Sequence, residues 1–456
     1  MMSSQQSSKG VYAAVWRWHF YAGLYVAPFL ILQALTGAAM LSKRPIERWQ
    51  LGTMLQNSGV INTTHQQRWE AAQAAVPGAT VTRYQPGRAA ETSRVTVTAG
   101  PRSYTVFVDA HTAAVTGTID DADRIDLIAD RLHGTLLMGR AGDRLIEIAA
   151  SLAIMLVSSG LYLWLPKLGS WAQSFRVVRG SRRLAWRSLH TTIGVALAPV
   201  LVFYLVSGLA WTDVWGERFV QSWSSLRTAQ AAPGEDLSHG HGALNGDSSR
   251  IVPWGLEQTP LPDASHAEHA SPDVAGRLSL DQAITIAQRE GIGQRFWVAV
   301  PPGTDRVWTI GQTVMNEDVV DPRRELIVHL DRRTGEVIGR VGWADYGLGA
   351  RAMAAGIPLH MGLLGWWNYL GALAVCLSVL GLSVAGLAMW WLRRPSREWR
   401  LAAPPRPADV RVPVGIWIVA VTLAVAFPMA GITIAAIAAL DWLVVRRVPR
   451  LKAFVN

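Results

Sequence analysis

Long apolar stretches alternate with polar segments along the 456 residues of the chain. The runs at 12–41, 144–165, 190–212 and 366–392 have the length that a membrane-spanning helix of about 20 residues requires. A further run, 413–445, contains Pro428 near its middle and is followed by basic residues. We predict a hairpin of two short helices over 413–446, the alternative being one long helix.

Two polar regions between the spans carry the pattern of small α+β domains. In the first, 42–126, a helical stretch QQRWEAAQAA precedes the alternating strands SRVTVTAG and RSYTVFVDA. In the second, 216–358, residues 224–276 are rich in Ser, Gly, Pro and His and are predicted to be flexible. An amphipathic helix, LSLDQAITIAQREGI, and several strands then fill 277–345. The two regions share a turn, VFVDAHTAAVTG in one and VHLDRRTGEVIG in the other.

Basic residues decide the predicted orientation of the spans. Arginine and lysine gather at 167–187 and 395–412, which the positive-inside rule places in the cytoplasm. The predicted fold is a membrane all-α helical bundle of four core helices plus a C-terminal two-helix hairpin, carrying two small α+β domains on the outside. In order, the segments are 1–41 (first span), 42–126 (outer domain), 127–166 (second span), 167–187 (linker), 188–215 (third span), 216–358 (outer region), 359–394 (fourth span), 395–412 (linker), 413–446 (hairpin) and 447–456 (cytoplasmic tail).

A spaced histidine pattern occurs twice in the apolar runs. The pattern H-x3-G-x4-P-x8-G begins at His19 and again at His190. A second histidine follows in each half, His133 in LHGTLLMG and His360 in LHMGLLG. Repetition at this level indicates an internal duplication of the membrane helices.

The depth of these four histidines predicts two cofactor sites. His19 and His190 stand at the cytoplasmic mouths of their spans, whereas His133 and His360 stand on the opposite side. Ionisable residues in or near the membrane usually serve a function. Histidine is a common axial ligand of haem, and such cofactors are bound between facing helices of bundles. We therefore predict two haem b groups, with His19 and His190 ligating one iron and His133 and His360 the other.

Charged side chains near the inner pair have a predicted role as well. Arg17 and Arg187 precede His19 and His190 and are candidates to bind haem propionates. Zinc or copper is the rival cofactor, and a histidine hydrogen-bonded to backbone or water at the membrane interface is the simpler alternative. The remaining histidines are assigned no function; a loose metal site or a solvated linker accounts for four of them (His239, His241, His266, His269), and three stand singly (His65, His111, His329).

The composition excludes several classes of protein. Half of the residues are hydrophobic and 17% are charged, as in membrane proteins. The net charge of +10 comes from residues that flank the spans, so it indicates topology and no nucleic-acid partner. The single cysteine, Cys376, excludes an internal disulfide and a cysteine-bound metal cluster. The chain has no phosphate-binding loop, dinucleotide fingerprint or nucleophile elbow.

The segments WRWHFYAGLYVAPFLILQALTG, LHGTLLMG, SSGLYLWLPK and LHMGLLG resemble the PepSY-associated transmembrane proteins, also called iron-regulated membrane proteins. The stretches AAQAAVPGA, VDAHTAAVTG and LDRRTGEVIG resemble PepSY domains, although Ala113 and Ala114 replace the usual Gly-Glu of the first turn. The resemblance implies a bacterial inner-membrane protein with PepSY-like domains in the periplasm. It also implies a di-haem ferric-siderophore reductase, in which no residue acts as a catalytic acid or base.

The resulting hypothesis is a di-haem b electron-transfer protein in the lipid bilayer. Quinol or a cytoplasmic donor would supply electrons, and a periplasmic ferric siderophore or other ferric chelate would accept them, which releases its iron. The alternative is a non-redox, membrane-anchored PepSY module that binds a peptide, a protease or another periplasmic ligand. A transporter, the third possibility, finds little support because the spans carry few charges besides the histidines.

Overall fold

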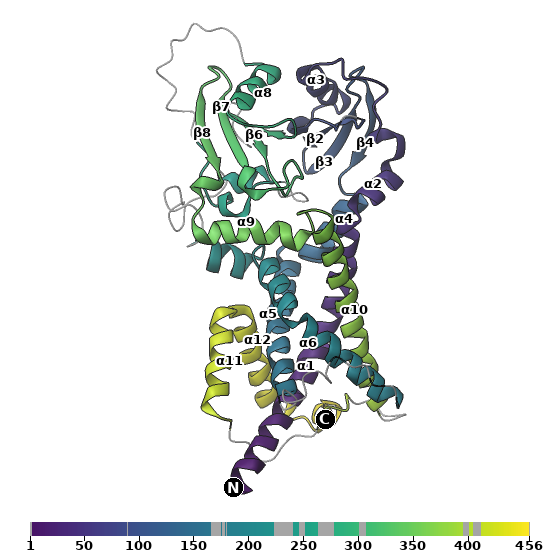
Figure 1. Cartoon of the computed structure of the whole chain (residues 1–456), viewed down its shortest axis with the longest axis vertical. Helices are drawn as coiled ribbons and strands as arrows, with labels where there is room; N and C mark the ends of the chain where they lie inside the picture. The colour runs from purple at the N-terminus through teal and green to yellow at the C-terminus, as the bar shows by residue number, and fades with distance from the viewer. Residues whose placement is uncertain are drawn as a thin grey trace. The chain divides into compact units, whose positions relative to one another are not determined.

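The computed structural model describes residues 2–88, 90–165, 175, 178, 180–222, 240–245, 251–262, 278–300, 307–394, 401–404 and 412–455. The chain divides into two compact units, and each is described here by itself (Figure 1). The helical unit comprises Met1–Ala38, Leu132–Phe219 and Gly371–Asn456. The sheet unit comprises Ala39–Arg131 and Val220–Leu370.

Long apolar helices form the helical unit. Five helices among the described residues are long and apolar enough to cross a membrane: Gly10–Leu41, Arg140–Trp164, Arg182–Leu209, Trp366–Arg393 and Pro428–Val445. The first four lie in α1 (Met2–Leu41), α5 (Arg140–Trp164), α6 (Arg182–Leu209) and α10 (Trp366–Arg393). At about 1.5 Å per residue, each exceeds the roughly 30 Å of a hydrocarbon core. Many of their apolar side chains are exposed, as lipid-facing residues are.

The C-terminal apolar run is broken into two helices at Pro428. Helix α11 (Val414–Ala426) ends before Phe427, and α12 (Pro428–Leu440) begins with the proline. Proline lacks the backbone N–H that would continue the first helix and disfavours helical geometry in the residue before it. Phe427 accordingly has φ −127° and ψ 79°. A π-helix (η10, Asp441–Val445) and α13 (Pro449–Val455) follow.

One antiparallel sheet of eight strands organises the sheet unit. Its order is β4-β3-β2-β1-β5-β6-β7-β8, so that the strands of both predicted outer domains join in one sheet (Figure 1). The two halves meet where Arg83 lies opposite Ala299 and Tyr84 opposite Val298. The strands are β1 (Thr80–Gln85), β2 (Ser93–Ala99), β3 (Arg102–Val108), β4 (Val115–Asp120), β5 (Trp297–Ala299), β6 (Val307–Gln312), β7 (Leu326–Asp331) and β8 (Val337–Gly342).

One helix from each half packs on the sheet. Helix α3 (His65–Ala75) starts at Thr64 and α8 (Leu280–Arg289) starts at Ser279, each with a capping box. The cap hydroxyl and the glutamine three residues later satisfy backbone N–H groups that the first turn leaves unpaired. In α8, Leu280, Ala283, Ile284 and Ala287 recur at helical spacing and are buried in the core formed with the strands.

The turns after β3 and β7 have the same hydrogen bonds although their sequences differ. Oδ1 of Asp109 accepts from the backbone N–H groups two and three residues later, and Asp331 does the same. In both turns the residue four positions after the aspartate is left-handed, Ala113 with φ 59° and Gly335 with φ 77°. Ala113 therefore keeps the turn geometry, at the strain that a Cβ adds at positive φ.

Residues 251–256 cover part of the opposite face of the sheet. Their side chains Ile251, Val252 and Leu256 are buried with strands β5 and β7 and with helix α9 (Leu348–Met361). The prediction of a flexible segment over 224–276 therefore does not describe these residues, because they contribute to an apolar core. Short turns of 3-10 or π-helix complete the described chain: η1 (Gly52–Leu55), η3 (Asp213–Gln221), η5 (His241–Leu244), η6 (Trp254–Leu256), η8 (Pro322–Arg324) and η9 (Trp343–Asp345).

His241 and His329, to which the sequence assigned no role, form a buried pair. They lie in η5 and β7, whose residues Leu244 and Ile327 pack in the same apolar core as residues 251–256. The Nε2 atoms of the two histidines are 2.9 Å apart. Nδ1 of His241 donates to the carbonyl of Thr259, and Nδ1 of His329 accepts from the hydroxyl of Thr309. These partners assign the shared hydrogen to His329, which donates it to His241. The other histidines once grouped with His241 (His239, His266, His269) lie outside the described residues.

This pair predicts a pH-dependent stability of residues 251–256. Burial lowers the pKa of both imidazoles, and the charge of His241 lowers that of His329 further. The unfolded state takes up protons below about pH 6.5 while the folded pair stays neutral, so stability falls as the pH falls below this value. Hydrogen exchange of 251–256, corrected for the intrinsic rate, should lose protection between pH 7 and 5.

The variant His329→Gln should show a weaker pH dependence of that protection, because glutamine does not titrate. His111→Gln, at an exposed histidine bonded to the carbonyl of Val60, is the matched control and should keep the wild-type slope. A wild-type protection that is constant over this range would contradict the prediction.

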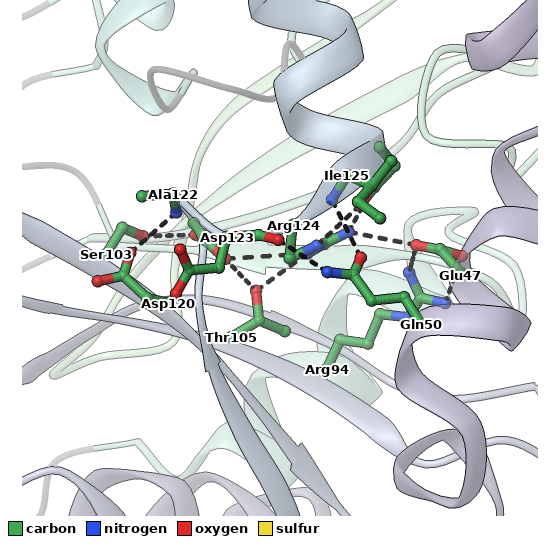
Figure 2. A network of polar contacts seen from close by, with 12 residues as sticks. Glu47, Gln50, Arg94, Ser103, Thr105, Asp120, Ala122, Asp123, Arg124 and Ile125 are labelled. Atoms are coloured by element: carbon green, nitrogen blue, oxygen red, sulfur yellow. Dashed lines mark hydrogen bonds and ion pairs between the residues drawn. The ribbon is translucent and has the colours of Figure 1, made fainter.

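A buried ionic network joins helix α2 (Lys43–Leu51), strand β2 and the start of helix α4 (Ile125–Thr135), as Figure 2 shows. Both carboxylate oxygens of Glu47 accept from Arg94, at 2.6 and 3.0 Å. Arg124 donates to Glu47 at 3.2 Å and to Asp126 at 2.6 Å. The network ties α2 and α4 to the sheet.

Candidate functional site

Two histidines predicted from the repeated pattern lie side by side in the helical unit. His19 comes from α1 and His190 from α6, and their ring centroids are 6.3 Å apart. The ring planes are nearly perpendicular, at 87°. The structure thus brings together the inner pair that the sequence predicted.

Hydrogen bonds at Nδ1 set the tautomer of both rings. Nδ1 of His190 lies 3.1 Å from the carbonyl of Leu382, which can only accept. Nδ1 of His19 lies 2.9 Å from Oγ of Ser159, whose own hydrogen is donated to the carbonyl of Leu156. Each Nδ1 therefore carries the hydrogen, and each Nε2 retains the lone pair with which neutral imidazole binds a metal.

Glycines lie against the rings of this pair. A Cβ at Gly160 on α5 would lie 3.1 Å from Cε1 of His19. A Cβ at Gly386 on α10 would lie 3.5 Å from Cε1 of His190. Sequence reasoning missed both positions; the segment SSGLYLWLPK contained Ser159 and Gly160, but nothing in its pattern assigned them to a histidine on another helix.

The donor set fits a haem better than a bare metal ion. Two metal–imidazole bonds of about 2.0–2.1 Å would place opposed ring centroids about 6.3 Å apart. Zinc is held by three or four protein ligands, and the described residues contain no group of three or more His, Cys, Asp or Glu side chains that could hold an ion. A porphyrin supplies its own four nitrogens and asks the protein only for axial ligands.

His133 has a similar environment in the same unit. Its Nδ1 lies 2.9 Å from Oγ1 of Thr36 on α1, and that hydroxyl donates to the carbonyl of Leu32. A Cβ at Gly37 would lie 3.6 Å both from Cε1 of His133 and from Sγ of Cys376. The ring of His133 therefore has the same kind of hydrogen bond as that of His19. Its Nδ1 donates to a hydroxyl, and its Nε2 keeps the lone pair that can bind a metal.

The outer pair remains a prediction. His360 lies in the last turn of α9, which belongs to the sheet unit, whereas His133 belongs to the helical unit.

The two arginines predicted to bind propionates, Arg17 and Arg187, differ in their contacts and exposure. Arg17 donates to the carbonyl of Pro404, and its guanidinium lies 5.1 Å from the ring centre of Tyr21. Arg187 is exposed on α6. The guanidinium of Arg393 lies 4.7 Å from the ring centre of Phe20, the residue after His19.

Comparison with known families gives a match over most of the chain. The model of the PepSY-associated TM region matches residues 16–393, which include His19, His133, His190 and His360. Among curated proteins, none matches the chain.

Proposed function

Because the chain belongs to the family of PepSY-associated transmembrane proteins and is a multi-pass membrane protein, we propose that it transfers electrons across a bacterial inner membrane through two haem b groups. His19 and His190 would hold the inner haem. His133 and His360 would hold the outer one. The proposed acceptor is a ferric siderophore or another ferric chelate in the periplasm.

The observation that carries the proposal is the adjacent pair His19 and His190, with both Nδ1 atoms engaged in hydrogen bonds and both Nε2 atoms left with their lone pairs. When bound, haem takes up and releases one electron at a time. Two histidine ligands leave no position for oxygen, which favours electron transfer over oxygen activation. The bonds to Ser159 and Leu382 orient the rings and raise the basicity of their ligating nitrogens.

Apolar helices surround the pair, and this setting would affect the reduction potential of a group bound there. Iron in a ferric chelate is the substrate of the proposed reaction, and one electron converts it to ferrous iron, which oxygen chelators bind more weakly. Release then follows from reduction alone, so no side chain has to donate or accept a proton. Under the positive-inside rule, the basic segments 167–187 and 395–412 would face the cytoplasm, and the sheet unit, whose turns resemble those of PepSY domains, would lie in the periplasm.

An absorption spectrum of the purified full-length protein, oxidised and reduced, tests the proposal. A pyridine haemochrome assay should find two haem b groups per chain. The variant His19→Ala or His190→Ala should lose one of them, and His133→Ala or His360→Ala should lose the other. Siderophore reduction by the reduced protein would be measured next.

His111→Ala, at an exposed histidine of the sheet unit, is the matched control and should keep both haems. A wild-type protein without a Soret band after expression with ample haem would contradict the redox function. It would favour the alternative of a membrane-anchored module that binds a periplasmic peptide, protease or other ligand.

A further inference from the structure

Arg393 ends helix α10 beside the inner histidine pair. Its guanidinium lies 4.7 Å from the ring centre of Phe20 and 5.7 Å from that of Trp16, both on α1. These two aromatic residues flank His19 in the sequence. The arginine is therefore held at the helix face that carries the candidate ligand.

Two nitrogens of this guanidinium lack a hydrogen-bond acceptor. Nε and Nη2 of Arg393 are buried and have no partner among the residues that the structure describes. A buried charged donor without an acceptor costs more than a neutral one, and contact with aromatic faces offsets only part of that cost. The side chain thus has two donors available for an anion.

A second arginine, Arg183, lies near Arg393. It stands in the first turn of α6, and the two positive charges repel each other. Arg183 stands seven residues before His190, and Arg393 stands seven residues after Gly386, which contacts His190. Seven residues are two helical turns, or about 10 Å along the axis and nearly the same face. Both arginines therefore lie at one end of the inner pair, where two like charges favour an anion between them.

We propose that Arg393, supported by Arg183, binds a carboxylate of the cofactor held by His19 and His190, namely a haem propionate. This assignment rests on the proposed function and transfers to Arg393 the role that sequence reasoning gave to Arg17, which donates to the Pro404 carbonyl. A guanidinium with two free N–H groups suits a carboxylate because it can donate to both oxygens.

The phosphate of an anionic lipid offers the same acceptor chemistry, and the reduction potential separates the two sources. Neutralising a guanidinium that is bound to a propionate leaves more negative charge near the iron and stabilises its oxidised state. The variant Arg393→Gln should therefore lower the midpoint potential of the haem that is lost in His19→Ala. It should also release that haem to excess apomyoglobin about tenfold faster or more, as expected for a lost charge-assisted hydrogen bond.

Arg394→Gln is the matched control, because the Arg394 guanidinium lies over Trp391, 5.6 Å from its ring centre. It should leave the midpoint potential and the rate of haem release unchanged. Arg393→Lys, which keeps the charge, should have a midpoint potential close to that of the wild type. Arg183→Gln should lower the potential by less than Arg393→Gln.

A di-haem protein whose inner potential and haem release are unaffected by Arg393→Gln would overturn the assignment but not the proposed function. Loss of a co-purifying anionic lipid from Arg393→Gln, seen by native mass spectrometry with an unchanged potential, would identify a lipid site and also overturn it. A wild-type protein without haem would overturn the proposed function itself.

Discussion

Replacing Gly160 by valine is expected to remove the proposed inner haem and to leave the proposed outer one in place. The Cβ alone would lie 3.1 Å from Cε1 of His19, closer than such atoms normally pack. The two further carbons of valine would displace the imidazole or its hydrogen bond to Ser159. Since His19 and His190 would hold the group together, a displaced His19 should abolish binding at that position.

The measurement is the haem count per chain, with the electron paramagnetic resonance spectrum to show which low-spin centre is lost. Gly371→Val is the matched control, because a Cβ at Gly371 on α10 meets nothing within 4 Å. Gly160→Ala should give an intermediate result, a retained haem with an altered spectrum. Two haems with unchanged spectra in Gly160→Val would show that His19 is not a ligand in the arrangement described.

Replacing Glu47 by alanine is expected to destabilise the sheet unit by about 3–5 kcal/mol, the range for breaking a buried ion pair. Glu47 is 4% exposed and accepts three hydrogen bonds, two from Arg94 and one from Arg124. Alanine would leave two arginines facing one another without the carboxylate between them. Hydrogen exchange of peptides from β2 and β3 in the full-length protein measures the change in the local free energy of unfolding.

The surface pair Arg323–Asp321 provides the control, since Arg323→Gln removes an exposed ion pair and should leave that exchange unchanged. Burial raises the pKa of Glu47, but Arg94, Lys43 and Arg124 lower it overall to about 2. The stabilisation should be present in full above about pH 4.5 and should be lost as the pH falls toward 2. Wild-type-like exchange in Glu47→Ala would contradict the role of the network.

Elements set by local sequence could be predicted well. The apolar runs have the length and composition of membrane helices, and five described helices meet that criterion. Pro428 disrupts the last run because of its own covalent structure. The capping residues Thr64 and Ser279 start α3 and α8 through bonds that span only three residues.

Features that depend on distant residues could not be predicted. The single sheet formed by the two polar regions requires β1 to pair with β5, more than 200 residues later, and strand periodicity does not specify a neighbour. His241 and His329 are 88 residues apart in the sequence, so only the fold shows that their rings are hydrogen-bonded to each other. The segment 251–256 has no periodic pattern, and its burial depends on the sheet and on α9.

The candidate site likewise has features that the local sequence predicts and features that depend on distant residues. Sequence by itself determined that His19 and His190 hold equivalent positions in two apolar helices, because spacing and hydropathy are local properties of the chain. Only the tertiary structure decided that His19 lies beside His190, that Ser159 and Leu382 bind their Nδ1 atoms, and that Arg393 has buried donors without an acceptor. Those contacts join α1, α5, α6 and α10, and the order of helices around a bundle follows from packing that no single stretch encodes.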